Sequence, residues 1–389
     1  MKRRIGILTS GGDCPGLNAA IRGVARAAYE LFDAEIIGIR NGYGGLIEGE
    51  YQEMSKKQFS GILTLGGTIL GTKRTPFKMM RVVEDDNIDK VAAMKKTYKA
   101  AKLDCLLCLG GNGTHKTANL LSEEGLNIIG LPKTIDNDIA VTDHAPGYGS
   151  AARYIAGTVS EISQDVRSLP IHVCIVETMG RNCGWITAAS ALARTGCGDG
   201  PDLIYLPERP FDPRRFLEDV ERLHREKGGV LVAASEGLRD LGGNPIVEPV
   251  VRIGRAAYYG DVGSHLSNLV IRELGIKARS EKPGIGDRAS IAFQSPLDCA
   301  EAEEAGRRAV RAAWDGQTGV MVGLRRISDS PYRTEDILVP IEQVMLRERT
   351  MPDEFISPEG NDVTPAFLQW CRPLLGGPLR RFVSFRQLL

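Results

Sequence analysis

Two carboxylates follow an apolar run in the first half of the chain and could act together. Residues 127–131 (Asn-Ile-Ile-Gly-Leu) predict a buried strand, and Asp136 and Asp138 come shortly after it. In an extended segment, residues two positions apart face the same side. One carboxylate could then accept a proton while the other helps to hold a metal ion. Each is also common in turns and helix caps, which leaves a structural role open.

Glycine-rich segments follow other apolar runs and could bind phosphate groups. Residues 9–16 (Thr-Ser-Gly-Gly-Asp-Cys-Pro-Gly) and 110–114 (Gly-Gly-Asn-Gly-Thr) each stand between a predicted strand and a predicted helix. Glycines there let backbone N–H groups approach an anion, and the helix N-terminus adds its dipole. Tight turns without any ligand are the alternative interpretation.

Several cations accompany these glycines. Residues 66–73 approach the P-loop pattern, but Thr72 stands where that pattern requires lysine. Lys73 and Arg74 still place two positive charges beside a glycine-rich turn, which suits a phosphate clamp. Arg181 follows the apolar run 172–176. Anion-binding loops, a carboxylate base and arginines are the groups that phosphoryl transfer requires.

The elements that must position these groups follow one pattern. Five nearly continuous apolar runs end in glycine or polar residues: 5–9, 104–109, 127–131, 172–176 and 229–234. Such runs are typical of parallel strands buried on both faces. Amphipathic helix patterns lie between them, which predicts an open α/β sheet. Ligands bind at the carboxyl ends of such strands, so we expect one site built from several strand ends. Residues 325–333 and 351–364 are predicted as turn and loop.

Composition excludes several classes of protein. The 389 residues carry 49 basic and 49 acidic side chains, and 42% are apolar. This argues against disorder and against a broad basic face for nucleic acid, but not against a small basic cleft. The length predicts two domains or three. No apolar run is long enough for a membrane helix. The eight scattered cysteines indicate a reduced cytoplasmic protein, and Cys105 and Cys108 are predicted to lie inside a buried strand.

The motifs taken in order resemble the phosphofructokinase family. They are GGDCPGLNAAIRG (11–23), GGTILGTKR (66–74), GGNGT (110–114), PKTIDND (132–138), ETMGR (177–181) and SEG (235–237), within a resemblance covering about residues 1–310. It implies an α/β fold of two Rossmann-like lobes with parallel sheets and the active site between them. Residues 1–148 with about 289–330 would bind the phosphoryl donor, about 149–288 would bind fructose 6-phosphate, and about 331–389 would form an extension packing on the second lobe.

The resemblance also implies roles for individual residues. Asp136 would be the general base for transfer to the 1-hydroxyl of fructose 6-phosphate, with Arg181 and Arg74 stabilising the transferred group. The donor site would comprise Gly12, Lys73, Arg74, Gly110, Gly111, Asn112, Gly113 and Thr114. The substrate site would comprise Thr134, Asp136, Asp138, His172, Met179, Gly180, Arg181, Glu236, Arg279 and Arg288. Asn112 and Asp138 would hold Mg2+. Some of the arginines reach in from a neighbouring subunit in the family, so a homodimer or homotetramer is implied.

Three positions depart from the common family pattern. Asn112 replaces an aspartate, which removes one negative charge from the magnesium site. His172 stands where a phosphate-binding arginine is frequent, and Ile285 replaces a histidine between the two late arginines. The last two leave the details of 6-phosphate binding open.

Two residues bear on the choice of donor and point in opposite directions. Gly113 leaves open the space that an aspartate fills in pyrophosphate enzymes, which favours ATP. Lys133 stands where common ATP enzymes have glycine and pyrophosphate enzymes have lysine. A filled space excludes a nucleotide, whereas an extra cation tolerates one, so we expect ATP, with pyrophosphate as the alternative. The mixture is similar to the mixed-substrate subgroup, group III.

Two functions of other kinds compete with this interpretation. A non-catalytic sugar-phosphate or nucleotide sensor could share the fold, because fold does not determine function. A kinase related to NAD or lipid kinases would explain GGNGT, but not PKTIDND and MGR together. Arg22 and Arg26 coincide with effector-site arginines of allosteric members, or form a solvated helix face, and regulation stays open.

Overall fold

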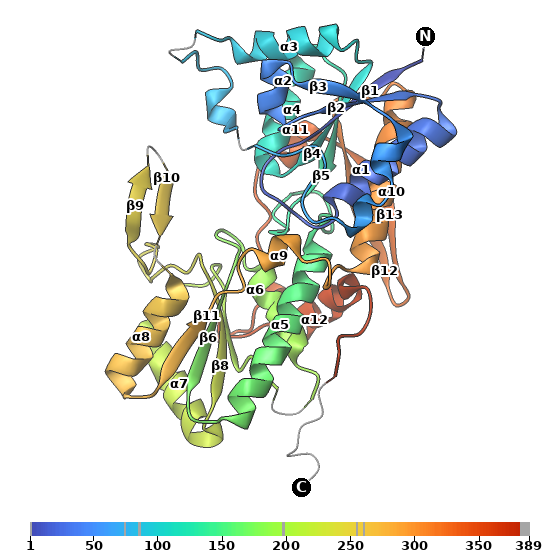
Figure 1. The fold of residues 1–389 in the computed structure, drawn as a ribbon. Helices are drawn as coiled ribbons and strands as arrows, with labels where there is room; N and C mark the ends of the chain where they lie inside the picture. The colour runs from blue at the N-terminus through green and yellow to red at the C-terminus, as the bar shows by residue number, and fades with distance from the viewer. Residues whose placement is uncertain are drawn as a thin grey trace. The chain divides into compact units, whose positions relative to one another are not determined.

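The chain forms two compact units, each discontinuous in sequence (Figure 1). Unit 1 comprises Met1–Ser150 and Arg288–Arg349, and unit 2 comprises Ala151–Asp287 and Thr350–Leu389. The computed structural model describes residues 2–73, 75–84, 87–196, 199–253, 256–259 and 261–381, with the backbone alone for 249–253 and 256–259. The boundary near residue 150 falls inside α5 (Tyr148–Ser168), and that near 287 inside α9 (Gly286–Ala289).

Unit 1 is built on a seven-stranded sheet of order β13-β12-β5-β4-β1-β2-β3. Its strands are β1 (Arg4–Thr9), β2 (Glu35–Ile39), β3 (Tyr51–Met54), β4 (Cys105–Gly110), β5 (Ile128–Pro132), β12 (Val320–Asp329) and β13 (Tyr332–Pro340). β2, β1, β4, β5 and β12 run parallel, and the edge strands β3 and β13 are antiparallel. The strands predicted at 5–9, 104–109 and 127–131 are confirmed. Cys105 and Cys108 lie buried in β4, as expected.

Helices cover this sheet. They are α1 (Leu17–Arg26), α2 (Tyr43–Glu48), α3 (Lys90–Ala100), α4 (Asn112–Glu123), α10 (Pro296–Trp314) and α11 (Ile341–Val344), with a π-helical turn η1 (Ala27–Leu31) and 3-10 turns η2 (Lys56–Phe59), η3 (Ile62–Thr64) and η4 (Phe77–Met79). One apolar cluster joins α2, α3, α4 and α11 to the sheet. Helix α1 packs against α10, and the first turn of α10 contacts the loop at Gly147 through Asp298.

Unit 2 has a four-stranded parallel sheet of order β11-β6-β8-β7. Its strands are β6 (Val173–Thr178), β7 (Leu203–Tyr205), β8 (Val230–Ser235) and β11 (Ala278–Glu281), beside a hairpin of β9 (Pro249–Ile253) and β10 (Ala256–Tyr259). The remaining elements are α6 (Trp185–Ala189), α7 (Pro213–Lys227), α8 (Val262–Leu274), α12 (Pro365–Cys371), η5 (Ser190–Ala193), η6 (Asp353–Phe355) and η7 (Arg372–Leu375). The apolar faces of α7 and α8 close the core of the unit. The strands predicted at 172–176 and 229–234 are confirmed.

The region after residue 320 differs from the sequence-based expectation. Residues 325–333, predicted as a turn, belong mostly to the hairpin of β12 and β13, with a register shift between Arg326 and Ser328. The polar side chains that suggested a turn alternate along a half-exposed hairpin at the edge of the sheet. A strand with one polar face has no continuous apolar run, so its sequence resembles that of a turn. Consequently the extension expected from about residue 331 starts at Thr350, because β13 completes the sheet of unit 1.

Residues after 350 contribute an aromatic cluster to unit 2. The ring of Trp185 lies 5.0 Å from that of Trp370 and 6.1 Å from that of Phe355. Trp185 is fully buried by this packing. Among the described residues, no helix combines the length and apolarity that a membrane span requires.

Candidate active site

In unit 1, the loops after β1, β4 and β5 meet at one edge of the sheet. The Ser10 amide donates to Leu109 O at 2.9 Å, and the Lys133 amide donates to Gly110 O at 3.0 Å. The Thr114 hydroxyl donates to Ser10 O at 3.3 Å. These bonds bring together the predicted donor-site glycines and the segment carrying Asp136, because the three strands are neighbours in the sheet.

Lys133 is buried beneath the first glycine-rich loop, with 6% of its surface exposed. Its ammonium donates to the carbonyl of Gly12. A buried ammonium needs such acceptors, since an unpaired one would be costly. Lys133 therefore joins the segment after β5 to the loop after β1.

The two carboxylates do not lie in an extended segment, and that premise of the sequence argument is wrong. Asn137, between them, has a left-handed backbone with φ 54°, and its side-chain Oδ1 accepts from the Ala145 amide at 3.0 Å. The Thr134 hydroxyl accepts from the Asp136 amide at 3.0 Å. The segment is a side-chain-stabilised turn, which asparagine tolerates better than most residues.

Asn112 and Asp138 face each other in unit 1. Asn112 Nδ2 donates to Asp138 Oδ2 at 2.9 Å and to the Asp138 carbonyl at 3.2 Å. The Asn112 side-chain oxygen and the second carboxylate oxygen of Asp138, both Oδ1, are buried and have no hydrogen-bond partner among the described residues. Burial, and next the charge of Glu348, raise the pKa of Asp138. Two neighbouring buried oxygens without donors fit a hard divalent cation, which prefers oxygen ligands.

The described part of the chain holds no cluster of side chains that could bind a metal ion by itself. Within the described ranges, no three His, Cys, Asp or Glu side chains are placed to hold an ion. Magnesium commonly takes only one or two protein ligands and fills its shell with water and substrate phosphates. Asn112 and Asp138 therefore match the modest protein contribution that this ion requires.

The remaining donor-site residues of unit 1 differ in how they are placed. Gly113 lies exposed in the first turn of α4, and a Cβ built on it meets nothing within 4 Å. Lys73 is 62% exposed and lies 3.8 Å from Glu48, Nζ to Oε1. Arg74 lies outside the described residues, so its predicted role has no structural counterpart here.

In unit 2, the predicted substrate residues gather at the carboxyl ends of β6 and β8. The Ser235 hydroxyl donates to Gly180 O at 2.8 Å, and the Glu236 amide donates to Thr178 O at 3.0 Å. Burial raises the pKa of Glu236, although the nearby Arg181 guanidinium opposes the change. Met179, Gly180, Arg181 and Glu236 thus form one cluster, as their positions after two neighbouring strands predict.

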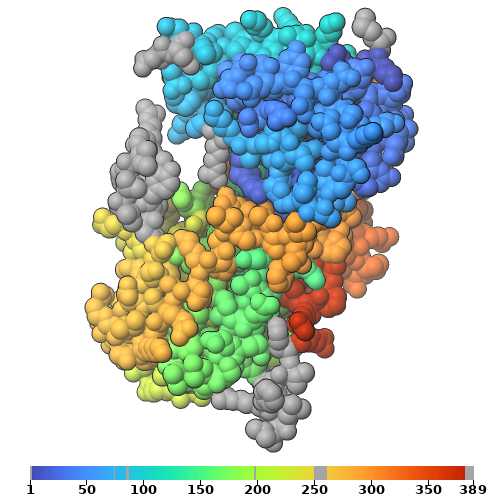
Figure 2. Space-filling view, in the orientation of Figure 1, coloured from blue at the N-terminus to red at the C-terminus, as the bar shows by residue number. Residues whose placement is uncertain are grey.

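His172 and Arg279 form a second cluster at the opposite end of the same sheet. His172 immediately precedes β6, and Arg279 pairs in register with Cys174 near the start of β6. His172 is buried, and burial followed by the charge of Arg279 lowers its pKa. Arg279 is exposed on the edge strand β11, and this strand contacts α8. Residues of α8 lie on the face of unit 2 shown in yellow and orange in Figure 2.

The last predicted phosphate ligand, Arg288, belongs to unit 1, whereas His172 and Arg279 belong to unit 2. Arg288 begins the second segment of unit 1, and its buried Nε has no partner among the described residues. Ile285, which stands where a histidine is common, is 70% exposed.

Comparisons with known proteins agree with these motifs. The phosphofructokinase family profile matches residues 4–313. The chain is 38% identical over 357 residues to an ATP-dependent 6-phosphofructokinase of Spirochaeta thermophila, covering 90% of this chain and 93% of that one. The chain belongs to the phosphofructokinase family.

The names of relatives within this family specify two different phosphoryl donors, ATP and pyrophosphate. A pyrophosphate–fructose 6-phosphate 1-phosphotransferase of Rhodospirillum rubrum is 33% identical over 395 residues, covering 96% of this chain and 95% of that one. The solved structure of a pyrophosphate-dependent phosphofructokinase from Nitrosospira multiformis matches with a TM-score of 0.85 at 27% identity, covering 98% and 94%. The chain is therefore a phosphotransferase of the phosphofructokinase type.

Arg22 and Arg26 of this phosphofructokinase, which the sequence left between two interpretations, bind a carboxylate. Their Nη1 atoms lie 2.8 and 2.9 Å from the two oxygens of Glu303 on α10. This ion pair joins α1 to α10, so the arginines have a structural role within the unit.

The sequence offered no indication of the residues that hydrogen-bond to the segments carrying the phosphofructokinase motifs or to loops next to them. In unit 1 these are Asp298 and Glu301 on α10, and His144. In unit 2, Glu208 accepts from the Gly184 amide at 2.9 Å and the Met351 amide at 3.1 Å. No short motif marks them, because each acts on a segment distant in sequence.

Proposed function

We propose that this protein transfers the γ-phosphoryl group of ATP to the 1-hydroxyl of fructose 6-phosphate, giving fructose 1,6-bisphosphate. Unit 1 binds the donor and supplies the base, and unit 2 supplies groups that bind the sugar phosphate. The observation that carries the choice of ATP is the open space at Gly113.

Asp136 accepts the proton of the attacking 1-hydroxyl as the oxygen bonds to phosphorus and the bond to ADP breaks. Its backbone is held by the Thr134 hydroxyl, which accepts from its amide at 3.0 Å. Arg181 balances the charge on the transferred group, and the Glu236 carboxylate accepts from sugar hydroxyls. Positioning and charge compensation carry most of such a reaction.

Asn112 and Asp138 are the residues that would hold Mg2+, since each has a buried side-chain oxygen without a donor among the described residues. When bound, this ion neutralises negative charge on the donor phosphates. Asn112 also keeps Asp138 oriented, through the bond from its amide to the carboxylate.

The donor is tested by a steady-state assay with each compound and by two substitutions at Gly113. Nothing lies within 4 Å of a Cβ built there, and its φ is not in the left-handed region, so both variants should fold. Gly113→Ala serves as the control and should keep ATP turnover within a few-fold. Gly113→Asp adds a charge and should raise the KM for ATP about tenfold or more by repelling the phosphates. Turnover with pyrophosphate and none with ATP in the parent enzyme would refute the choice.

Pyrophosphate is the second candidate, favoured by Lys133. Its ammonium lies under the donor loop and contacts the Gly12 carbonyl, and the same cation could attract a diphosphate. In that case Lys133→Gly should abolish turnover with pyrophosphate and leave any ATP turnover.

A homo-oligomer is part of the proposal. Met179 and Arg181 lie at the carboxyl end of β6, whereas His172 and Arg279 lie at its amino end, so one sheet cannot offer both clusters to one small sugar phosphate. We infer that the exposed Arg279 serves the site of a second copy, with the buried His172 beside it at the start of β6. Mixing an Asp136→Asn variant with an Arg279→Ala variant should restore activity if subunits exchange, because one site of the mixed dimer is then intact. The absence of recovery in verified mixed oligomers would refute this.

The location proposed for the enzyme is the cytoplasm. The described cysteines form no disulfide, which is compatible with a reducing compartment.

A further inference from the structure

Gly147 is the point in unit 1 where the loops around the candidate base meet. Its φ is 105°, and a Cβ built on it would lie 1.8 Å from Cys14 Sγ and 3.3 Å from the Thr134 carbonyl. The loop after β1 and the segment after β5 therefore both pack on the backbone of this residue. A shift of Gly147 would displace both.

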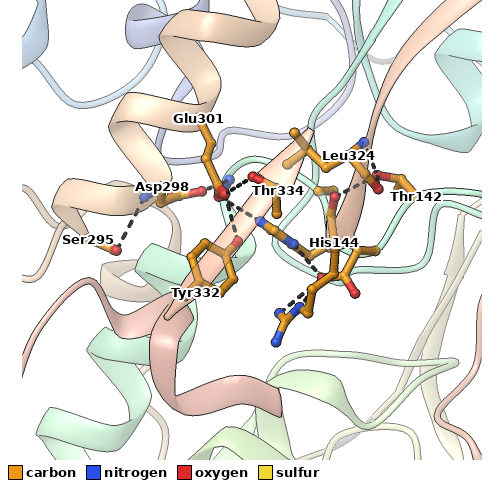
Figure 3. A network of polar contacts seen from close by, with 12 residues as sticks. Thr142, His144, Ser295, Asp298, Glu301, Leu324, Tyr332 and Thr334 are labelled. Carbon is orange, nitrogen blue, oxygen red and sulfur yellow. Dashed lines mark hydrogen bonds and ion pairs between the residues drawn. The ribbon is translucent and has the colours of Figure 1, made fainter. Parts of the chain in front are cut away.

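Asp298 holds Gly147 from the first turn of α10. One carboxylate oxygen accepts from the Gly147 amide at 2.8 Å, and the other accepts from the Ser150 amide at 3.3 Å and the Ser150 hydroxyl. The side chain is 2% exposed. Ser295 caps the helix by accepting from the Asp298 amide at 3.3 Å, which fixes where the carboxylate emerges (Figure 3).

A short chain of contacts leads from this carboxylate to the candidate base. Gly147 forms a parallel bridge with Thr134, whose amide donates to Pro146 O at 3.2 Å. The Thr134 hydroxyl in turn accepts from the Asp136 amide at 3.0 Å. The first links are backbone contacts of the buried residues Gly147 and Thr134, and the last runs through the Thr134 hydroxyl. Closely packed interiors transmit small shifts, so a displacement of Gly147 should reach Asp136.

A second anchor acts on the same segment one helical turn later. Glu301 Oε2 lies 2.7 Å from His144 Nε2, and Glu301 Oε1 accepts from the hydroxyls of Tyr332 and Thr334 at 2.7 and 3.0 Å (Figure 3). The other ring nitrogen of His144 lies 2.8 Å from Asp143 Oδ2. Two acidic residues of α10 thus hold residues 143–150 from one side.

We propose that Asp298 is a positioning residue for phosphoryl transfer: through Gly147 and Thr134 it sets the place of the Asp136 carboxylate. This inference rests on the proposed role of Asp136 as the base. Burial raises the pKa of Asp298 to about 6, so the carboxylate is mostly ionised at neutral pH and above. The carboxylate then offers acceptors only, which matches the donors around it.

The test is Asp298→Asn, which keeps the shape of the side chain but replaces one carboxylate oxygen, an acceptor, by an NH2 group, a donor. A misplacement of about 1 Å can reduce a rate by a hundredfold, so we expect kcat to fall about tenfold or more, with both KM values within about twofold. Glu304→Gln is the matched control, because Glu304 lies on the same helix with its side chain 61% exposed. That variant should behave as the parent enzyme.

A double variant separates positioning from mere stability. If Asp298 acts through Asp136, adding Asp298→Asn to Asp136→Asn should cost little further activity. Independent, multiplying losses would overturn the inference, as would a kcat within twofold for Asp298→Asn alone. If Asp136→Asn alone keeps near-parental activity, the proposed base is wrong, which is a different outcome. Should Asp298→Asn not fold, Ser150→Ala removes one of its donors and should lower kcat a few-fold.

Discussion

The segment after β5 in unit 1 and the turn after β6 in unit 2 each follow an inner strand of their sheet but are held differently. In unit 1, ionisable side chains of α10 clamp the segment through Gly147 and His144. In unit 2, the Met179–Arg181 turn is held mainly by its backbone, with Gly180 O accepting from Ser235 and with Gly237 packed on Arg181. The first support should respond to charge and pH, and the second to side-chain volume.

The largest effect should come from removing the group that the support in unit 1 serves. In Asp136→Asn the proposed base loses the carboxylate that would accept the hydroxyl proton, and loss of a general base costs about a hundredfold or more in kcat. The thermal unfolding temperature should change little, since the side chain is only half-buried at the end of the segment. A forward rate within a few-fold of the parent would show that Asp136 is not the base.

Gly237→Ala tests the volume-sensitive support. The new Cβ would lie 1.8 Å from the Arg181 carbonyl oxygen, so the turn must move. We expect kcat/KM for fructose 6-phosphate to fall about tenfold or more, since substrate-positioning groups tolerate little displacement. The loss should be the same from pH 6 to pH 9. A loss that varied with pH would contradict the distinction between the two supports.

His144→Gln tests the charge-sensitive support. Burial opposes the charge on His144, but the hydrogen bonds and charges of Asp143 and Glu301 outweigh it and raise the pKa to about 9. A histidine whose pKa is raised by folding stabilises the fold below its unfolded pKa of about 6.5 and loses that contribution as the pH rises through about 9.

The unfolding temperature of the parent should therefore fall relative to His144→Gln between pH 7 and pH 10, by several degrees. Arg326, Tyr332 and Asp298 also belong to this region, and they are common to both proteins, so the difference isolates His144. Parallel curves for the two proteins would show that the ion pair adds no pH-dependent stability.

Glu208→Gln should have the smallest effect. Burial raises the pKa of Glu208, and its main bonds are from the Gly184 and Met351 amides, which a neutral glutamine oxygen can also accept. We expect kcat and KM within about twofold, because one acceptor oxygen satisfies the same donors. A large loss would mean that unit 2 too depends on a buried charge.

The sequence predicted elements that are encoded by consecutive residues and missed contacts between segments distant in the chain. Continuous apolar runs located β1, β4, β5, β6 and β8, because buried parallel strands leave that signal along the chain. The hairpin of β12 and β13 was missed, since an edge strand with one polar face resembles a turn. The spacing of Asp136 and Asp138 suggested an extended segment, but Asn137 bends it through a bond to Ala145.

Long-range support gave no signal at all. Asp298 lies 151 positions from Gly147, and an aspartate in the first turn of a helix reads as an ordinary capping residue. The separation of His172 and Arg279 from Arg181 likewise follows from the direction of β6, which motif spacing does not encode.

The late position of β12 and β13 has a consequence for synthesis. The four-stranded sheet of unit 2 is complete once residue 281 has been made, whereas the sheet of unit 1 waits for residues 320–340. Domains generally fold as units while the chain emerges from the ribosome. The emerging polypeptide therefore exposes the unpaired edge of β5 while the sheet of unit 2 forms. A chain released by a ribosome that stalled before α10 would lack Asp298 and its hydrogen bonds to Gly147 and Ser150.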